Sequence, residues 1–330
     1  MLFDEKDEIR CDLSKTINDI SNYKTNSSGD ESILGGIECI AKLYRIFCND
    51  YGGDDIIEAE KIARSLNNDI LLAHVYRYAE FLPNCSVDAK KEFFLKGYEI
   101  FRQNSMEDHA IYCKNNMLVE QFYTDRVLPE EFREMQTEAL NNVPGMIGLS
   151  HIFNNTGVAY LYCGRPSEAS DYFTRGLGYA VYQDRIVQRF ALESNRMIAE
   201  SYSFALVEET RIRALVRQIF DGMGIRKLPF LTADYILNIL AVAYRQNPRF
   251  GLELIETHPI DTLINESFRH NLMCASERIL HLQYLASHHT YTFPLLEICN
   301  IPEITNTACG KRKEFILKYG YNPFEFNTWL

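Results

Sequence analysis

The middle of the chain repeats itself at intervals of 40 residues. Asn115, Asn155 and Asn195 recur at that spacing. Other residues keep the same register: Tyr112, Ile152 and Leu192; Val119, Ala159 and Ala199; Phe122, Tyr162 and Tyr202. Self-similarity at a period of roughly 20 to 50 residues is typical of stacked repeat proteins, in which each unit buries its apolar side only against its neighbours. The register therefore predicts an array of similar units with a long surface on which a ligand can be held.

The pattern within and around these units is helical. From about residue 54 onward, apolar residues recur every three or four positions, and no segment alternates as a β-strand does. Prolines are sparse and stand where helices are expected to begin or connect, as at Pro129, Pro166 and Pro248. We therefore expect an all-α fold built from antiparallel helix pairs.

Three segments are expected along the chain. Residues 1–53 form an acidic N-terminal helical segment with a polar, turn-rich linker at 21–32. Residues 54–250 carry the repeats. Residues 251–330 form a helical region that caps the array, with an aromatic tail containing the single tryptophan, Trp329. The alternative use of this tail is docking to another protein.

The clearest repeat spans residues 153–180. It has the following residues at helical spacing: Phe153, Gly157 and Tyr160 in a first helix, Gly164 and Pro166 at the turn, and Ala169, Phe173 and Leu177 in a second helix. Gly157 and Ala169 are small enough to let the two helices approach closely. Large aromatic side chains fill the space beside them. This unit resembles a tetratricopeptide repeat.

The resemblance covers about residues 70–250 and includes departures from the usual pattern. Thr156 stands where Leu is usual, and Gly176 stands where Ala is usual. In the neighbouring units Met117 and Arg77 replace the glycine. The period of 40 exceeds the usual 34 or so, so the helices or turns should be extended. The resemblance implies a superhelical solenoid of stacked helix pairs.

The recurring asparagines are the candidate binding residues. In tetratricopeptide proteins the first helices line a concave groove, and an Asn in this part of the helix often holds the backbone of a bound peptide. A side-chain amide offers both donors and acceptors, which match the N–H and C=O groups of an extended ligand. The candidate ligand-binding set is Asn115, Asn154, Asn155, Asn195, Phe122, Tyr162 and Tyr202. The alternative is that these asparagines only bond to adjacent helix turns.

The sequence contains no recognisable motif for catalysis or metal binding. It has no Gly-rich phosphate loop ending in Gly-Lys-Ser/Thr, no Gly-x-Ser-x-Gly and no His-Glu-x-x-His. His281, His288, His289 and Cys299 lie near one another but without the regular spacing of a zinc site. We expect no catalytic residues, no metal and no cofactor, and an enzyme is kept only as a third class of function.

Charge narrows the class of partner. The net charge of −11 disfavours direct binding to nucleic acid, which needs a basic surface. Residues 1–60 hold 14 acidic and 6 basic side chains, which are expected to solvate this segment; a basic docking partner is the alternative. Glu80, Glu120 and Glu200 also recur in register and are expected to pair with nearby Arg or Lys.

Cysteine usage and the absence of apolar runs bear on the compartment. The nine cysteines are scattered through apolar stretches without a Cys-x-x-Cys, as expected for small buried residues in a reducing cytosol. The first residues, MLFDEKDEIR, lack the apolar core of a signal peptide, and no run of 18 apolar residues occurs. We expect a cytoplasmic protein that does not interact with a membrane.

These observations predict a non-enzymatic module that binds a protein or peptide in the concave groove, as a scaffold or an accessory subunit of a partner enzyme or ATPase. The alternative is a peptide-responsive regulator that changes conformation on binding. Bacterial pheromone receptors and the sensor arms of signalling ATPases use degenerate repeats of this kind. Self-association into a homo-oligomer is a further expectation left open.

Overall fold

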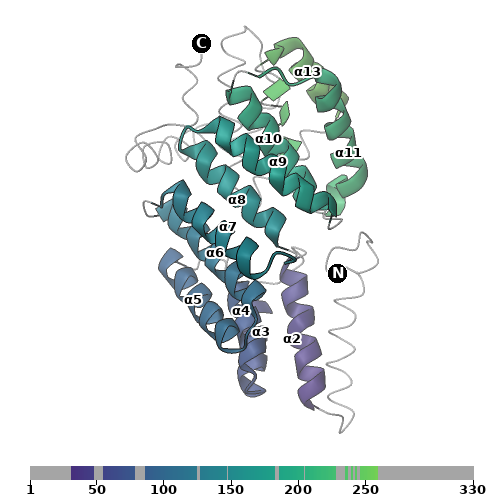
Figure 1. Cartoon of the computed structure of the whole chain (residues 1–330). Coiled ribbons are helices and arrows are strands. Elements are labelled where there is room, and N and C mark those ends of the chain that lie inside the picture. Colours follow the sequence, from purple (N-terminus) through teal and green to yellow (C-terminus); the bar gives the residue numbers. More distant parts are fainter. Residues whose placement is uncertain are drawn as a thin grey trace. The chain divides into compact units, whose positions relative to one another are not determined.

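A computed structural model of the chain describes residues 31–47, 55–78, 86–124, 127–146, 148–182, 186–203 and 205–227, and part of 235–258. These residues are mainly helical and include no β-strand, which confirms the all-α prediction (Figure 1). Residues 1–30 and 259–330 lie outside the described residues, and with them most of the expected N-terminal segment and the expected aromatic cap.

The chain divides into two compact units, Met1–Gly148 and Leu149–Leu330. Unit 1 contains α2 (Glu31–Phe47), α3 (Asp55–Ser65), α4 (Asp69–Arg77), α5 (Val87–Gln103), α6 (Glu107–Thr124) and α7 (Pro129–Asn142). Unit 2 contains α8 (Leu149–Tyr162), α9 (Pro166–Tyr182), α10 (Ile186–Tyr202), α11 (Glu209–Lys227) and α13 (Pro248–Thr257). The division falls inside the stretch 54–250, in which the sequence predicts repeats, and the predicted boundaries at 53 and 250 remain predictions.

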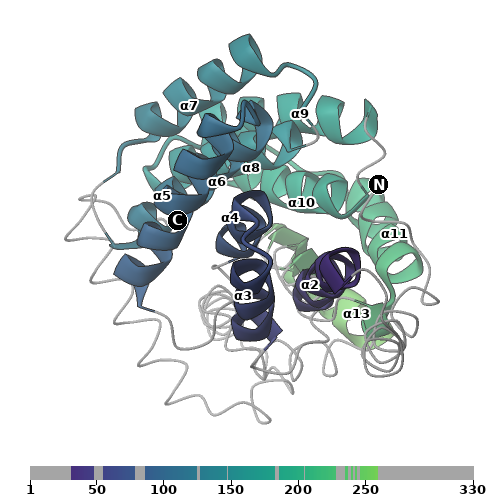
Figure 2. The same ribbon diagram turned by 90° about the horizontal axis from the view of Figure 1, so that it is seen from below.

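Helices of unit 1 pack in adjacent pairs. α2 packs on α3, α4 on α5, and α5 on α6, and Figure 2 shows α5 beside α6 and α3 beside α4. The core of the first helices is apolar and almost fully buried, and includes Cys39, Leu43, Ala59, Leu72 and Tyr76. Because each helix buries one apolar face against its chain neighbours, most contacts in this unit are local.

Local signals in the sequence determine where helices of unit 1 begin. Asn68 caps the start of α4: its Oδ1 accepts a hydrogen bond from the backbone N–H of Leu71 at 2.9 Å, and the helix begins at Asp69. Ser86 Oγ accepts from the backbone N–H of Ala89 at 3.2 Å in the same way before α5. Pro129 is the first residue of α7, where its missing N–H leaves no helical hydrogen bond unmade.

In unit 2, α8 and α9 form the helix pair that the sequence predicts most clearly. Gly157 of α8 lies directly against Phe173 of α9, and a Cβ atom on Gly157 would be 2.5 Å from Cε1 of the ring. Phe173 and Ala169 are fully buried. Gly164 adopts a φ of 74° in the turn, a conformation that favours glycine, and α9 begins two residues later with Pro166.

The third helix of unit 2 packs on the first two. α10 contacts both α9 and α8, and α11 in turn contacts α10 (Figure 1). Leu192 of α10 fits against Gly176 of α9, where an added Cβ would lie 2.7 Å from Leu192 Cδ2 and 2.8 Å from Phe153 Cβ. This contact leaves no space for a residue larger than glycine at position 176.

Candidate ligand-binding site

Two of the predicted binding residues belong to unit 1 and are buried there. The Asn115 side chain has no exposed surface, and its Nδ2 donates a hydrogen bond to Asn116 Oδ1 at 3.1 Å. Phe122 is also buried and lies edge-to-face with Phe132, with ring centroids 5.9 Å apart. Both side chains therefore contact other parts of unit 1 in this structure.

Two asparagines of unit 2, Asn154 and Asn195, lie where α8 and α10 meet. Asn195 Nδ2 of α10 donates a hydrogen bond to Asn154 Oδ1 of α8 at 2.9 Å, between residues 41 positions apart. Asn155 lies one residue further along α8, where its Nδ2 is 3.2 Å from Nε2 of His151. All three side chains are half-buried. We call Asn154, Asn155 and Asn195 the amide face.

The predicted aromatic anchors do not line this face as a set. Tyr202 is buried in the core that α8, α9 and α10 share, near Tyr160 and Ala199. Tyr162 is the last residue of α8, and its side chain lies outside the described residues. The structure thus brings Asn154 and Asn195 together and places Tyr202 in the core of unit 2.

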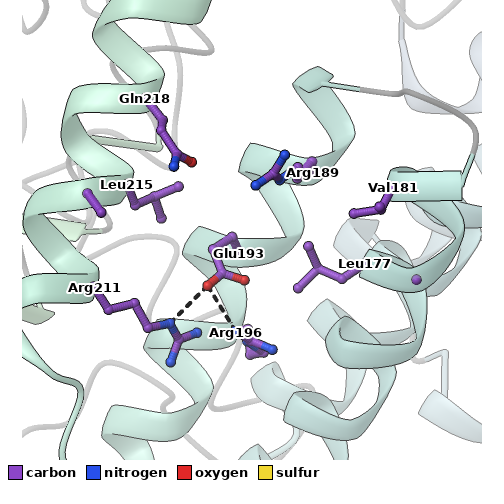
Figure 3. Close-up of a pocket in the computed structure, with 10 residues that line it drawn as sticks. Leu177, Val181, Arg189, Glu193, Arg196, Arg211, Leu215 and Gln218 are labelled. Atoms are coloured by element: carbon purple, nitrogen blue, oxygen red, sulfur yellow. Dashed lines mark hydrogen bonds and ion pairs between the residues drawn. The ribbon is translucent and has the colours of Figure 1, made fainter.

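A pocket of about 510 Å³ opens on another side of α10, between α9 and α11. Figure 3 shows α10 in the middle, with α9 and α11 on either side of it. Leu177 and Val181 of α9 and Leu215 of α11 supply apolar lining. Val181 is 60 % exposed although it is apolar. The pocket therefore offers apolar surface that a ligand can cover.

Charged side chains line the same pocket. Arg189, Glu193 and Arg196 follow one another at i, i+4 and i+7 along α10, so they share one face of the helix. Glu193 Oε1 accepts hydrogen bonds from Arg196 Nη2 and from Arg211 Nε of α11, both at 2.9 Å (Figure 3). Arg211 Nη1 also donates to Glu200 Oε2 at 2.5 Å.

Arg196, Arg211, Glu193 and Glu200 form a closed network of four charges. Arg196 Nε completes it by lying 3.4 Å from Glu200 Oε1. Burial alone would lower the pKa of Arg211, but its hydrogen bonds and charge interactions with Glu200 and Glu193 raise that pKa above its ordinary value. The network therefore ties α10 to α11 at this end of the pocket.

Arg189 lies at the other end of the pocket and is exposed. Among the residues the structure describes, it has no ion-pair partner and no hydrogen-bond acceptor. One buried donor in the network, Arg211 Nη2, also has no hydrogen-bond acceptor there. The pocket thus combines apolar walls with guanidinium groups that retain donors.

The sequence reasoning missed this pocket. The stripe formed by Arg189, Glu193 and Arg196 was visible as an i, i+4, i+7 pattern, but the contribution of α11 depends on where that helix packs.

The expectation that register carboxylates pair with cations is confirmed where it can be checked: Glu200 pairs with Arg211, and Glu120 lies 3.5 Å from Lys90. Glu80 lies outside the described residues.

The remaining expectations concern metal-binding groups, the burial of cysteines and membrane-spanning helices. In the described part of the chain, no group of three or more His, Cys, Asp or Glu is placed to hold a metal ion, and no helix is long and apolar enough to span a membrane. The histidine cluster His281, His288 and His289 and Cys299 lie outside the described residues. Cys39 and Cys113 are fully buried, and burial raises the pKa of the Cys39 thiol to about 12.

Comparison with protein-family models, with curated proteins and with solved structures finds no match to this chain.

Proposed function

We propose that the protein is a non-enzymatic, tetratricopeptide-like module that binds an extended peptide segment of a partner protein along the amide face. The observation that carries this proposal is the hydrogen bond between Asn195 and Asn154, at 2.9 Å. It joins two helices that are one repeat period apart, and Asn195 stands at a position where the resemblance to the repeat family predicts contact with a peptide backbone.

The chemistry of the amide face supports this role. A side-chain amide has two N–H donors and a carbonyl oxygen with two lone pairs, so the bond to Asn195 uses only part of the hydrogen-bonding capacity of Asn154. The Asn154 Nδ2 has no hydrogen-bond partner among the described residues. The pair also holds both side chains in place, which lowers the conformational entropy lost when a ligand binds.

The repeat architecture is part of the same proposal. α8–α9 and α10–α11 are taken as two consecutive repeats of a solenoid, with α8 and α10 as first helices. The close contact between Gly157 and Phe173 supports this reading, as does the direct contact of α8 with α10. In such an array the first helices line one continuous surface.

The test compares partner capture by the full chain with capture by the double variant N154A/N195A. We expect the variant to lose the captured partner while its melting temperature stays close to that of the unaltered protein. Each lost amide contact should weaken binding by about 0.5–1.5 kcal/mol. The matched control is N141A/N142A, which removes two exposed amides at the end of α7 in unit 1.

The two measurements separate binding from packing. A lower melting temperature with unchanged capture would mean that the Asn154–Asn195 pair only joins α8 to α10, and the proposal would fail. Equal loss of capture in N141A/N142A would also contradict it, because those amides belong to a different unit.

A further inference from the structure

The pocket between α9, α10 and α11 has an excess of one positive charge. Arg196 and Arg211 share the two carboxylates Glu193 and Glu200, so the charges of these four side chains balance. Arg189 lines the same pocket and has no carboxylate partner among the described residues. An exposed guanidinium beside apolar walls is therefore the distinctive chemical feature of this pocket.

We propose that this pocket binds a ligand that carries a single carboxylate on an aliphatic stem. Arg189 holds the carboxylate, because a guanidinium presents parallel N–H donors that match the two carboxylate oxygens. Leu177, Val181 and Leu215 cover the stem. The volume of about 510 Å³ lies within the range of roughly 300–1,000 Å³ that is common for small-ligand sites.

The charge balance selects a monoanion. A phosphate group carries a charge of about −1.5 to −2 near neutral pH. Arg189 can balance only one negative charge, so the remainder would be repelled by Glu193. A cationic ligand is repelled by the positive charge of Arg189. An uncharged ligand leaves the guanidinium of Arg189 without an acceptor as its surroundings become covered.

The opposite end of the pocket also favours a ligand with an acceptor group. Arg211 Nη2 is a buried donor without a hydrogen-bond acceptor among the described residues, which is rare in folded proteins. Arg211 shares Glu193 with Arg196, which is seven residues from Arg189 on α10, about 10 Å along the helix axis. A second oxygen on the ligand, placed beyond its stem, accepts from Arg211 Nη2 after a small rotation of that guanidinium group.

This site is independent of the amide face. Asn195 contacts α8, whereas Glu193 contacts α11, so the two surfaces use different sides of α10. Binding in the pocket therefore neither requires nor replaces peptide binding along Asn154 and Asn195.

The test is calorimetric titration of the full chain with two matched pairs of probes. The first pair is hexanoate and hexylamine. The second pair is a capped Leu-Leu-Glu-Leu-Leu peptide and its Gln counterpart. We expect the acid of at least one pair to bind ten-fold or more tightly than its partner. If only hexanoate binds, the ligand is a small carboxylic acid. If only the Glu peptide binds, the ligand carboxylate belongs to a glutamate of a protein segment. The proposal is overturned if neither acid binds, or if each non-acidic partner binds as tightly.

Two variants locate the binding site. Arg189→Gln should weaken binding of the acid about ten-fold, whereas Arg217→Gln, an exposed arginine of α11 outside the pocket, should leave it unchanged. Gly178→Leu should weaken binding about ten-fold, because it places a branched side chain in the pocket beside Leu177 and Val181. A Cβ added at Gly178 meets nothing within 4 Å, so the fold should be retained. The matched control is Gly36→Leu in α2, where an added Cβ is equally unobstructed.

The outcomes distinguish this site from the amide face. The variant N154A/N195A should bind the acid as the unaltered protein does. Equal weakening by Arg189→Gln and Arg217→Gln would show a general attraction between acids and surface arginines, and would overturn the proposal. So would full binding by a folded Gly178→Leu variant.

Discussion

Gly157 and Phe173 are in such close contact that a Cβ atom on residue 157 would lie within 2.5–2.9 Å of three ring carbons. Contacts this short are essentially absent between real side chains, so one of the two helices would have to move. The ring of Phe173 has no exposed surface and cannot swing into solvent. The spacing of α8 and α9 therefore depends on the absence of a side chain at Gly157.

Replacing Gly157 by Ala should lower the free energy of unfolding. Overpacking of a well-filled core typically costs about 1–3 kcal/mol. The gain in helix propensity from Gly to Ala, up to about 1 kcal/mol, offsets only part of this loss. Urea denaturation followed by circular dichroism measures the difference.

Gly178→Ala is the control for this prediction. It lies in α9, and a Cβ added there meets nothing within 4 Å, so only the propensity gain should remain. Its free energy of unfolding should rise by up to about 1 kcal/mol. If both variants gained stability, the contact between Gly157 and Phe173 would not limit the packing of α8 and α9.

The helix pair of residues 153–180 could be predicted from the sequence because its contacts are local. Gly157 and Phe173 are separated by only one turn and two short helical stretches, and the spacing of apolar residues specifies which faces meet. Gly164 and Pro166 add a turn signal of their own. The packing of α11 on α10 could not be predicted in this way, because no spacing of residues in the sequence specifies where α11 lies on α10.

The candidate sites were harder to predict because exposure depends on packing between distant segments. The register of 40 residues places Asn115 and Asn195 at equivalent positions, but it cannot say which of them is covered. Asn115 is fully buried in unit 1, whereas Asn195 is half-buried and bonded to α8. The pocket was missed because Arg211 reaches Glu193 from a separate helix.

Gly176→Ala should destabilise this protein. The added Cβ would lie 2.7 Å from Leu192 Cδ2 and 2.8 Å from Phe153 Cβ. We expect a loss of about 1–3 kcal/mol in the free energy of unfolding, measured by urea denaturation.

A double-mutant cycle with Leu192→Ala tests the cause. Leu192 has no exposed surface, so its truncation alone should lower stability by about 2–5 kcal/mol. The double variant should lose less than the sum of the two, by about 0.5–3 kcal/mol, because the truncated side chain makes room for the methyl group added at position 176. Strict additivity would show that Gly176 is not kept small by Leu192.

The four-charge network should contribute more stability than an exposed ion pair. Glu193→Gln removes the carboxylate that Arg196 and Arg211 share, and the side chains involved are only 17–28 % exposed. We expect the free energy of unfolding to fall by about 1–2 kcal/mol, more than the 0.2–1 kcal/mol typical of surface pairs. Chemical denaturation at low and high salt measures it.

Glu253→Gln is the comparison for this network. Glu253 accepts two hydrogen bonds from Arg213, at 2.9 and 2.8 Å, but both side chains are 42–51 % exposed. This variant should lose less stability than Glu193→Gln, and salt should reduce its loss further because exposed charges are screened. Equal losses in the two variants, with equal salt dependence, would contradict the special role of the network.

Unit 1 contains a buried histidine whose pKa links stability to pH. His74 packs edge-to-face against Phe101 and His109, with ring centroids 5.0 and 4.9 Å away. Burial, followed by the charges of His109 and Arg77, lowers the pKa of His74 to about 4. Arg77 also donates to His109 Nδ1 at 2.9 Å, and burial likewise lowers the pKa of His109.

Stability should therefore fall as the pH is lowered from 7 to 5. The unfolded chain takes up a proton on His74 near its ordinary pKa of about 6.5, whereas the folded protein does so only near 4, so protonation favours unfolding throughout this window. For His74 alone we expect a loss of about 2 kcal/mol in the free energy of unfolding, measured by urea denaturation at each pH. His74→Gln should be less stable at neutral pH, because ring contacts are lost, but its stability should depend less on pH. An unchanged slope in that variant would show that His74 does not carry the pH dependence.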